Sequence, residues 1–297
     1  MSTNILELKE EVFSNRTKKE AYFHSLLTHL KGIKIGNSLA NEKIREILNK
    51  YGNFEEYYKI KFGFFKAEID EKFENKLLNS IKESNFNLLT IHDKNFPKSL
   101  KEDSTLTPLI YTSGNLDLLN KKSMGFVGTR GSLKLEKSQE LTTNEEKFGK
   151  IAAKRVASNY TITSGIAIGS DSIGHIEALK THNSTIGVIA KPINEIYSKI
   201  NQKLQERIQN EGLLVSEYPF CSPFFSSYLS NRNKTTVALS SEGIVVLYAG
   251  DKSGTIHAIK EAYRVGKPIY VIEELIDQNC SWIEKYQDKI KLFKAEK

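Results

Sequence analysis

Apolar residues between positions 124 and 272 come in short runs that are separated by longer amphipathic segments. The runs are candidate strands, at residues 124–128, 160–163, 185–190, 212–216, 243–248 and 268–272. The segments between them are long enough for helices, at residues 144–158, 171–182, 200–210 and 254–265. Short apolar strands that alternate with helices are typical of a parallel sheet with both faces covered. We therefore predict an α/β fold with a doubly wound, mostly parallel sheet.

The start of the chain has a different pattern, in which apolar residues recur at helical spacing. Tyr22, Leu26 and Leu30 form one such stripe. The pattern predicts a small all-helical domain over residues 1–82. Residues 83–297 then form the α/β domain, which opens with two short strands between Pro and Gly turns.

A paired-glycine hairpin interrupts the helical region as GIKIG, from Gly32 to Gly36. Such a hairpin between two helices occurs in helix–hairpin–helix DNA-binding modules. It also occurs in helical domains that only pack against their neighbours. The sequence leaves both interpretations open.

Composition permits an anionic partner and excludes several classes of protein. The net charge is +7 and the pI is about 9.1, but the basic excess is spread along the chain, so folding must gather it. Cys221 and Cys280 are far apart and have no paired His, which excludes a disulfide framework and a zinc cluster. No stretch approaches the ~20 apolar residues that span a bilayer, and the acidic start lacks a signal core. We expect a cytoplasmic protein without a membrane partner.

The segments that follow the predicted strands combine small residues with cations. Ligands of open parallel sheets bind beyond the carboxyl ends of the strands, where glycines and helix N-termini suit phosphate groups. We predict that these segments meet at one phosphate-binding edge. The candidate residues are Gly128, Thr129, Arg130, Ser164, Gly165, Gly169, Lys191, Arg232, Asn233, Lys234, Lys252, Ser253 and Gly254. In this interpretation Arg232 lies in a loop that follows the strand at 212–216.

Neither a cofactor nor a catalytic group is predicted. The segment SGIAIG is not the GxGxxG fingerprint, and no acidic residue ends the next strand, which disfavours a dinucleotide cofactor. His175 lies in a helical segment beside apolar Ile173 and Ile176, as a buried structural histidine does. Paired carboxylates, a nucleophile elbow and metal-ligand spacing do not occur. We predict a binding protein without catalytic residues, cofactor or metal.

An ordered set of short segments resembles the DprA/Smf family of DNA-processing proteins. The set is FPKSL, TPLIYTSGN, GFVGTR, ITSGIAIGSD, TIGVIA, EGLLVSEYPF, SNRNKTTVALS and VVLYAGDKSGTIHAIKEAYRVGKPIYVI, over roughly residues 85–283. The resemblance implies an extended Rossmann-like fold after a SAM-like helical domain. It also implies a homodimer that binds and protects single-stranded DNA without sequence preference and loads a RecA-type recombinase during natural transformation.

The resemblance carries over to individual positions, with departures. Arg130 matches the family's arginine after the first strand, and Arg232 with Asn233 matches its Arg-Asn pair. Ser164, Gly165 and Gly169 match its glycine loop, and Ser253 with Gly254 its Ser-Gly turn. Lys191 falls in a loop where some members have a basic residue. Lys234 stands where a second arginine is common, and an insertion spans roughly residues 131–144.

Two alternatives from other classes stay open. LOG-type hydrolases of nucleotide phosphoribosyl bonds have a related fold, but Ala258 stands where their catalytic Glu belongs. A nucleotide-sensing domain is the third possibility.

The aromatic run Phe220, Phe224, Phe225 and Tyr228 either stacks bases at the rim or belongs to a packed loop or dimer contact.

Overall fold

The computed structural model describes residues 5–30, 40–63, 69–129, 132–134, 137–139, 143–181, 184–277 and 280–294. The chain divides into two compact units. The first comprises Met1–Ser113, Lys191–Glu195 and Ser216–Phe225, and the second comprises Gly114–Ala190, Ile196–Val215 and Ser226–Lys297. The domain boundary after residue 82 stays a prediction from the sequence.

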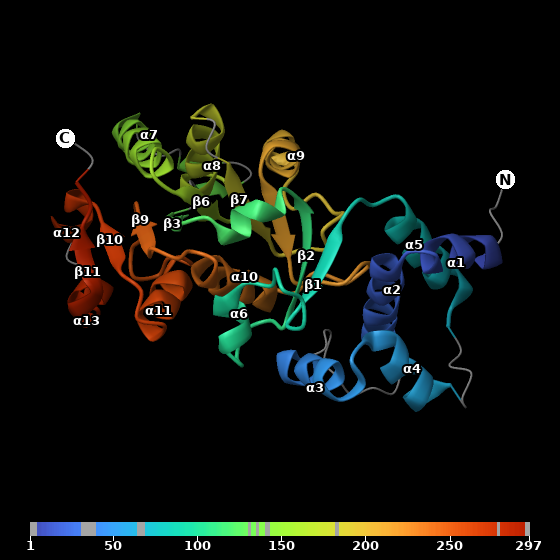
Figure 1. Ribbon diagram of the computed structural model, residues 1–297. Coiled ribbons are helices and arrows are strands. Elements are labelled where there is room, and N and C mark those ends of the chain that lie inside the picture. Colours follow the sequence, from blue (N-terminus) through green and yellow to red (C-terminus); the bar gives the residue numbers. More distant parts are fainter. Residues whose placement is uncertain are drawn as a thin grey trace. The chain divides into compact units, whose positions relative to one another are not determined.

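The first unit begins with helices, as the spacing of apolar residues predicts (Figure 1). They are α1 (Ile5–Phe13), α2 (Arg16–His29), α3 (Asn41–Tyr51), α4 (Phe54–Phe62) and α5 (Glu71–Lys82). Helices α2, α4 and α5 each follow a capping residue whose side chain accepts a backbone hydrogen bond from the first turn. These capping residues are Asn15, Asn53 and Asp70. Asn and Asp are among the preferred residues at this position because they satisfy a free N–H of the first turn. The glycine hairpin at 32–36 lies outside the described residues.

A short antiparallel strand pair follows the helices. Strands β1 (Asn87–Thr90) and β2 (Leu109–Gly114) flank the short helix α6 (Lys98–Glu102). Tyr111 on β2 is fully buried, and its hydroxyl lies 2.7 Å from Nδ1 of His24 on α2. The strand pair therefore packs with the helices within the first unit.

The second unit contains a sheet whose described strands follow the order β8-β7-β6-β3-β9-β10-β11. Their bounds are β3 (Ser123–Val127), β6 (Thr161–Ser164), β7 (Thr185–Ile189), β8 (Leu213–Ser216), β9 (Ile244–Val246), β10 (Ile269–Val271) and β11 (Ile290–Leu292). The pairs β3–β6, β6–β7, β3–β9, β9–β10 and β10–β11 are parallel. The predicted α/β class with a mostly parallel sheet is confirmed.

Helices cover both faces of this sheet. The first group, α7 (Thr143–Ala157), α8 (Ser170–Lys180) and α9 (Gln202–Glu211), lies on one side, and α10 (Ser227–Ala238) and α11 (Ile256–Arg264) lie on the other (Figure 1). Helix α8 comes close to β3 at Gly174, where an added Cβ would stand 2.7 Å from a ring carbon of Phe126. The sheet core is built from fully buried apolar residues such as Val245 and Ile162. Burial on both faces explains why these strands are continuous apolar runs in the sequence.

Four segments differ from the sequence predictions or add to them. The segment around Arg232, expected as a loop after the strand at 212–216, forms part of helix α10. The basic segment that follows β10 contains the short helix α13 (Ser281–Lys285) and the edge strand β11. Part of the predicted insertion forms an antiparallel pair, β4 (Ser132–Lys134) with β5 (Lys137–Gln139). A short helix α12 (Glu273–Asp277) follows β10.

None of the helices in the described part of the chain combines the length and the apolar character that a bilayer crossing requires.

Candidate functional site

A pocket of about 620 Å³ opens beyond the carboxyl end of β3 in the second unit. This is the point where the strand order reverses, because β6 lies on one side of β3 and β9 on the other. Ligands of doubly wound sheets bind at such a switch point. Residues 127–129 at the end of β3 form part of its wall.

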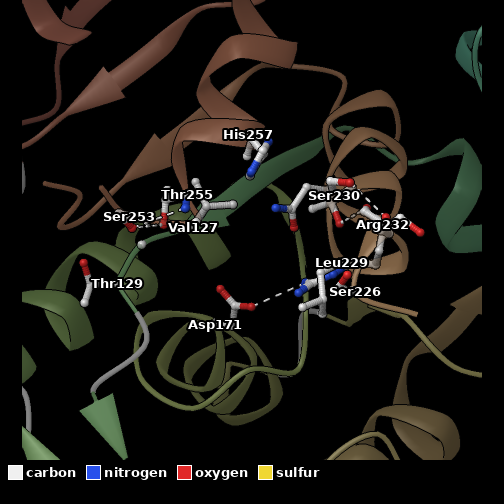
Figure 2. A pocket seen from close by; sticks show the side chains of 16 residues that line it. Val127, Thr129, Asp171, Ser226, Leu229, Ser230, Arg232, Ser253, Thr255 and His257 are labelled. Atoms are coloured by element: carbon white, nitrogen blue, oxygen red, sulfur yellow. Dashed lines mark hydrogen bonds and ion pairs between the residues drawn. The ribbon is translucent and has the colours of Figure 1, made fainter. Parts of the chain in front are cut away.

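The starts of three helices form the rest of the wall (Figure 2). Asp171 lies in the first turn of α8. Helix α10 and the residue before it contribute Ser226, Ser227, Leu229, Ser230, Arg232, Asn233 and Thr236. The loop and first turn of α11 contribute Ser253, Gly254, Thr255, His257 and Ala258. Helix N-termini carry unpaired N–H groups and a partial positive charge, so this arrangement suits an anion.

A buried ion pair lies in the pocket wall. Nη1 of Arg232 is 3.5 Å from Oδ2 of Asp171, and the two side chains are only 4% and 10% exposed. The same carboxylate oxygen accepts a hydrogen bond of 3.3 Å from the backbone N–H of Ala167. The pair therefore links the first turn of α8 to the middle of α10.

The guanidinium of Arg232 is enclosed on several sides. Its Cζ lies 5.8 Å from the centroid of the Tyr197 ring. A Cβ added to Gly165 would overlap Nη1, so the position requires glycine. Nε of Arg232 is buried and has no hydrogen-bond partner among the described residues. A buried donor without a partner costs about 1–3 kcal/mol.

The glycine turn between β6 and α8 supports this wall through structural hydrogen bonds. The hydroxyl of Ser164 donates to the carbonyl of Phe126 on β3, at 2.5 Å. Gly169 has φ 91°, a left-handed backbone conformation that favours glycine, and it is followed directly by α8. The backbone of Gly165 is in turn bonded to His175.

His175 is a structural histidine, as expected. It is fully buried, its Nε2 donates to the carbonyl of Gly165, and its Nδ1 lies 2.8 Å from Oγ1 of Thr185. Burial lowers the pKa of His175 to about 4. The side chain therefore ties the glycine turn to β7 in its neutral form.

The loop before α11 satisfies most of its own backbone donors. The Ser253 hydroxyl accepts from the N–H of Thr255 at 3.2 Å, and the N–H of Ile256 donates to the Ser253 carbonyl at 3.1 Å. Gly254 between them is exposed, and a Cβ there would meet nothing within 4 Å. The loop thus presents small residues to the pocket, and a ligand can approach its backbone.

The start of α10 is the part that the sequence did not indicate as helical. Ser226 makes no side-chain capping bond, and both Ser226 and Ser227 are exposed at the pocket. Their hydroxyls are hydrogen-bond donors at the start of the helix. The run SSYLS contained the signal, because serines are common where a helix begins.

Comparisons with known proteins place this chain in a family. The family model of DNA recombination-mediator protein A, which is the DprA/Smf family, matches residues 87–286. The chain belongs to this family. The resemblance to DprA/Smf proteins found in the sequence is therefore confirmed.

Curated DprA/Smf proteins match over more than half of the chain. DNA processing protein DprA of Bacillus subtilis is 27% identical over 221 residues, which cover 72% of this chain and 70% of that protein. Protein Smf of Synechocystis is 30% identical over 199 residues, 66% of this chain and 48% of that protein. Streptococcus pneumoniae DprA is 29% identical, and the match covers 63% of each chain. The chain thus spans between about half and 70% of these DprA/Smf relatives.

Solved DprA structures share the fold. DprA from Streptococcus pneumoniae aligns with a TM-score of 0.64 at 23% identity, over 99% of this chain and 95% of that one. DNA processing protein A from Helicobacter pylori, studied for its single-stranded DNA binding mode, aligns with a TM-score of 0.59 at 24% identity, over 72% and 93%.

The structure brings six of the thirteen predicted DprA/Smf site residues together around the pocket. They are Gly128, Thr129, Arg232, Asn233, Ser253 and Gly254. Ser164, Gly165 and Gly169 form the turn behind its wall. Lys234 follows on α10, and Lys252 is exposed before the loop of α11. Their role in binding stays a prediction.

Two predicted cations are not placed at the pocket. Lys191 belongs to the first unit, where its Nζ is 4.0 Å from Oε2 of Glu195. Arg130 lies outside the described residues. The hypothesis that all five cations meet at one edge therefore stays a prediction.

The aromatic run divides into buried and exposed members. Phe220 is fully buried, with its ring centroid 4.9 Å from that of Phe86, and Tyr228 is also buried. Phe224 is 49% exposed. Phe220 and Tyr228 are therefore packing residues, whereas about half of Phe224 is accessible to solvent.

Proposed function

We propose that the chain binds single-stranded DNA without sequence preference, with backbone phosphates held in the pocket of the second unit. The observation that carries the proposal is a pocket wall that combines the starts of three helices with the guanidinium of Arg232. Helix N-termini and a guanidinium both favour an anionic ligand. Membership of the DprA/Smf family supports DNA as the source of that anion.

Sequence independence follows from the chemistry of the wall. Hydroxyls, backbone N–H groups and a guanidinium recognise phosphate oxygens, which are the same at every nucleotide. The Helicobacter pylori relative is described with a single-stranded DNA binding mode, which supports the choice of a single strand. We further propose protection of the bound strand, a homodimer and delivery of the strand to a RecA-type recombinase, as the family resemblance implies.

Binding, not hydrolysis, is the activity that we propose for the pocket. Ala258, at the position of the catalytic Glu of LOG-type hydrolases, is buried and lines the pocket without a carboxylate. The carboxylate in the described wall is Asp171, which is engaged by Arg232. Incubation with AMP followed by product analysis tests the enzyme alternative, and release of adenine would overturn our choice.

The test of DNA binding is fluorescence anisotropy with a 20-nucleotide oligothymidylate and a duplex of the same length. We expect the single strand to bind more tightly. The double variant Ser226→Ala/Ser227→Ala is expected to weaken single-strand binding about tenfold, because two hydroxyl donors at the pocket are lost. Ser158→Ala is the matched control, since Ser158 is exposed on the segment after α7 and is absent from the pocket wall.

The same assay tests the predicted cations that the pocket does not include. Arg130→Ala and Lys191→Ala are each expected to weaken binding in a chain that is still folded. If Ser226→Ala/Ser227→Ala, Arg130→Ala and Lys191→Ala all bound DNA as tightly as the wild type, the proposed site would be refuted.

A further inference from the structure

The loop between β9 and α11 is fixed at its start by two neighbouring elements. The carbonyl of Tyr248, just after β9, accepts hydrogen bonds from the N–H and the hydroxyl of Thr129, at 2.6 and 2.9 Å. The next carbonyl, that of Ala249, accepts a hydrogen bond of 2.8 Å from Nε1 of Trp282, a buried side chain on α13. The loop therefore begins between the end of β3 and α13.

Asp251 makes a further contact with α13 through its carboxylate. Its Oδ1 accepts a hydrogen bond of 2.9 Å from the hydroxyl of Ser281, the first residue of α13. This bond, together with bonds from the backbone N–H groups of Ser281 and Trp282, lowers the pKa of Asp251. An acidic residue next to Lys252 is unexpected beside a proposed DNA site. Its carboxylate, however, is engaged by α13, and Asp251 does not line the pocket.

The part of the loop that reaches the pocket has no such support from packing at its glycines. Ser253 and Gly254 line the pocket, and Lys252 before them is exposed. An added Cβ at Gly250 or Gly254 would meet nothing within 4 Å, and glycine has more backbone freedom than any other residue. The turn bond from the Ser253 N–H to the Gly250 carbonyl, at 2.9 Å, fixes the local shape of the loop. Its direction depends on the contacts with β3 and α13.

We infer that Asp251 is a positioning residue for DNA: by holding the loop to α13, it orders Lys252 beside the pocket, and Ser253 and Gly254 in its wall, before a strand binds. The inference rests on the proposed function in taking DNA as the ligand. Its consequence is opposite in sign to simple electrostatics. Removal of a negative charge near a polyanion strengthens binding, whereas a released loop has to be ordered on binding, which weakens it.

Two substitutions of Asp251 separate its charge from its hydrogen bonds. Asp251→Ala removes both, whereas Asp251→Asn removes the charge and keeps an acceptor oxygen for the Ser281 hydroxyl. Asp288→Ala is the matched control, because it removes one negative charge from an exposed residue of the same unit that does not line the pocket. Binding of oligothymidylate to the full chain is measured by fluorescence anisotropy.

Asp251→Ala is expected to bind oligothymidylate about fivefold more weakly than the wild type, because the loop is then ordered at the expense of binding. Asp251→Asn is expected to stay within about twofold of the wild type, since its amide oxygen preserves the contact with Ser281. The control Asp288→Ala is expected to bind no more weakly than the wild type. Equal or tighter binding by Asp251→Ala than by the wild type would overturn the inference. Binding by Asp251→Asn as weak as that of Asp251→Ala would overturn it too, since hydrogen bonding would then not explain the effect.

Hydrogen–deuterium exchange in the free protein tests the order of the loop without DNA. The N–H groups of Ser253 and Thr255 are hydrogen-bonded within the loop, so their exchange rates report how often it opens. We expect faster exchange over residues 250–255 in Asp251→Ala and wild-type rates in Asp251→Asn. Unchanged exchange in Asp251→Ala would contradict the role of Asp251. If the wild type does not bind oligothymidylate, the proposed function is refuted, and the exchange rates still decide whether Asp251 orders the loop.

Discussion

The guanidinium of Arg232 lies against the backbone of Gly165, in the space where a side chain on residue 165 would begin. The glycine therefore determines where the only buried arginine in the described pocket wall can lie. The ion pair with Asp171, the turn before α8 and the pocket wall all depend on this close approach.

Gly165→Ala is expected to lower the free energy of unfolding by about 3 kcal/mol, because the new methyl group displaces Arg232 from its buried pair. Urea denaturation measures the change, and anisotropy with oligothymidylate measures the accompanying loss of binding. Gly250→Ala is the control, since an added Cβ at Gly250 meets nothing within 4 Å. A Gly165→Ala protein as stable as the control would contradict the packing that we describe.

The buried ion pair itself is expected to be costly to break from one side. Asp171→Asn leaves the charge of Arg232 buried without a counter-charge, so we expect a loss of about 3–5 kcal/mol. Asp171→Leu/Arg232→Met removes both charges and is expected to lose less than Asp171→Leu alone. A double-mutant cycle by urea denaturation checks this, and strictly additive losses would show that the two side chains do not interact.

Lys252 tests whether an exposed cation beside the pocket contacts DNA. The Lys252→Ala variant is expected to reduce the slope of log affinity against log salt by about 0.7, the value for one phosphate contact on a single strand. Lys203→Ala removes the same charge from an exposed position on α9 that does not line the pocket. Lys203→Ala is expected to leave the slope unchanged. An equal effect of both variants would mean that the overall positive charge of the protein, and not a contact of Lys252 with DNA, sets the salt dependence.

Stability is expected to decrease in mild acid because two buried histidines bind protons only when the chain unfolds. Burial lowers the pKa of His175 to about 4 and that of His24 to about 3, both below the ordinary value of about 6.5. Their contributions are fully present above about pH 6.5 and are lost as the pH falls through the folded-state values. His175 alone accounts for about 3 kcal/mol between pH 7 and pH 4.

Urea denaturation at several pH values measures this dependence, with His175→Gln as the comparison. The variant still offers a donor to the Gly165 carbonyl, and its folding is verified at pH 7. We expect a shallower decrease between pH 6.5 and 4 than in the wild type. Parallel curves for the two proteins would mean that His175 is not responsible.

The sequence by itself determined the class of fold and the loops that carry the site. Runs such as 185–190 and 243–248 are continuously apolar, as is typical of parallel strands that are covered on both faces. In the structure these runs contain β7 and β9. Because parallel strands end at one edge, residues after separate strands, such as Thr129 and Ser253, could be predicted as neighbours. The ordered segments also indicated the DprA/Smf family.

Only the tertiary structure decided what Arg232 does. Local pattern predicted a loop around it, whereas packing of residues such as Val237 and Tyr228 produced helix α10. The partner of Arg232 is Asp171, which lies on another helix and far away in the sequence. Periodicity reports which face of an element is buried, but an ion pair depends on the distance between elements, and that distance is set by the whole core.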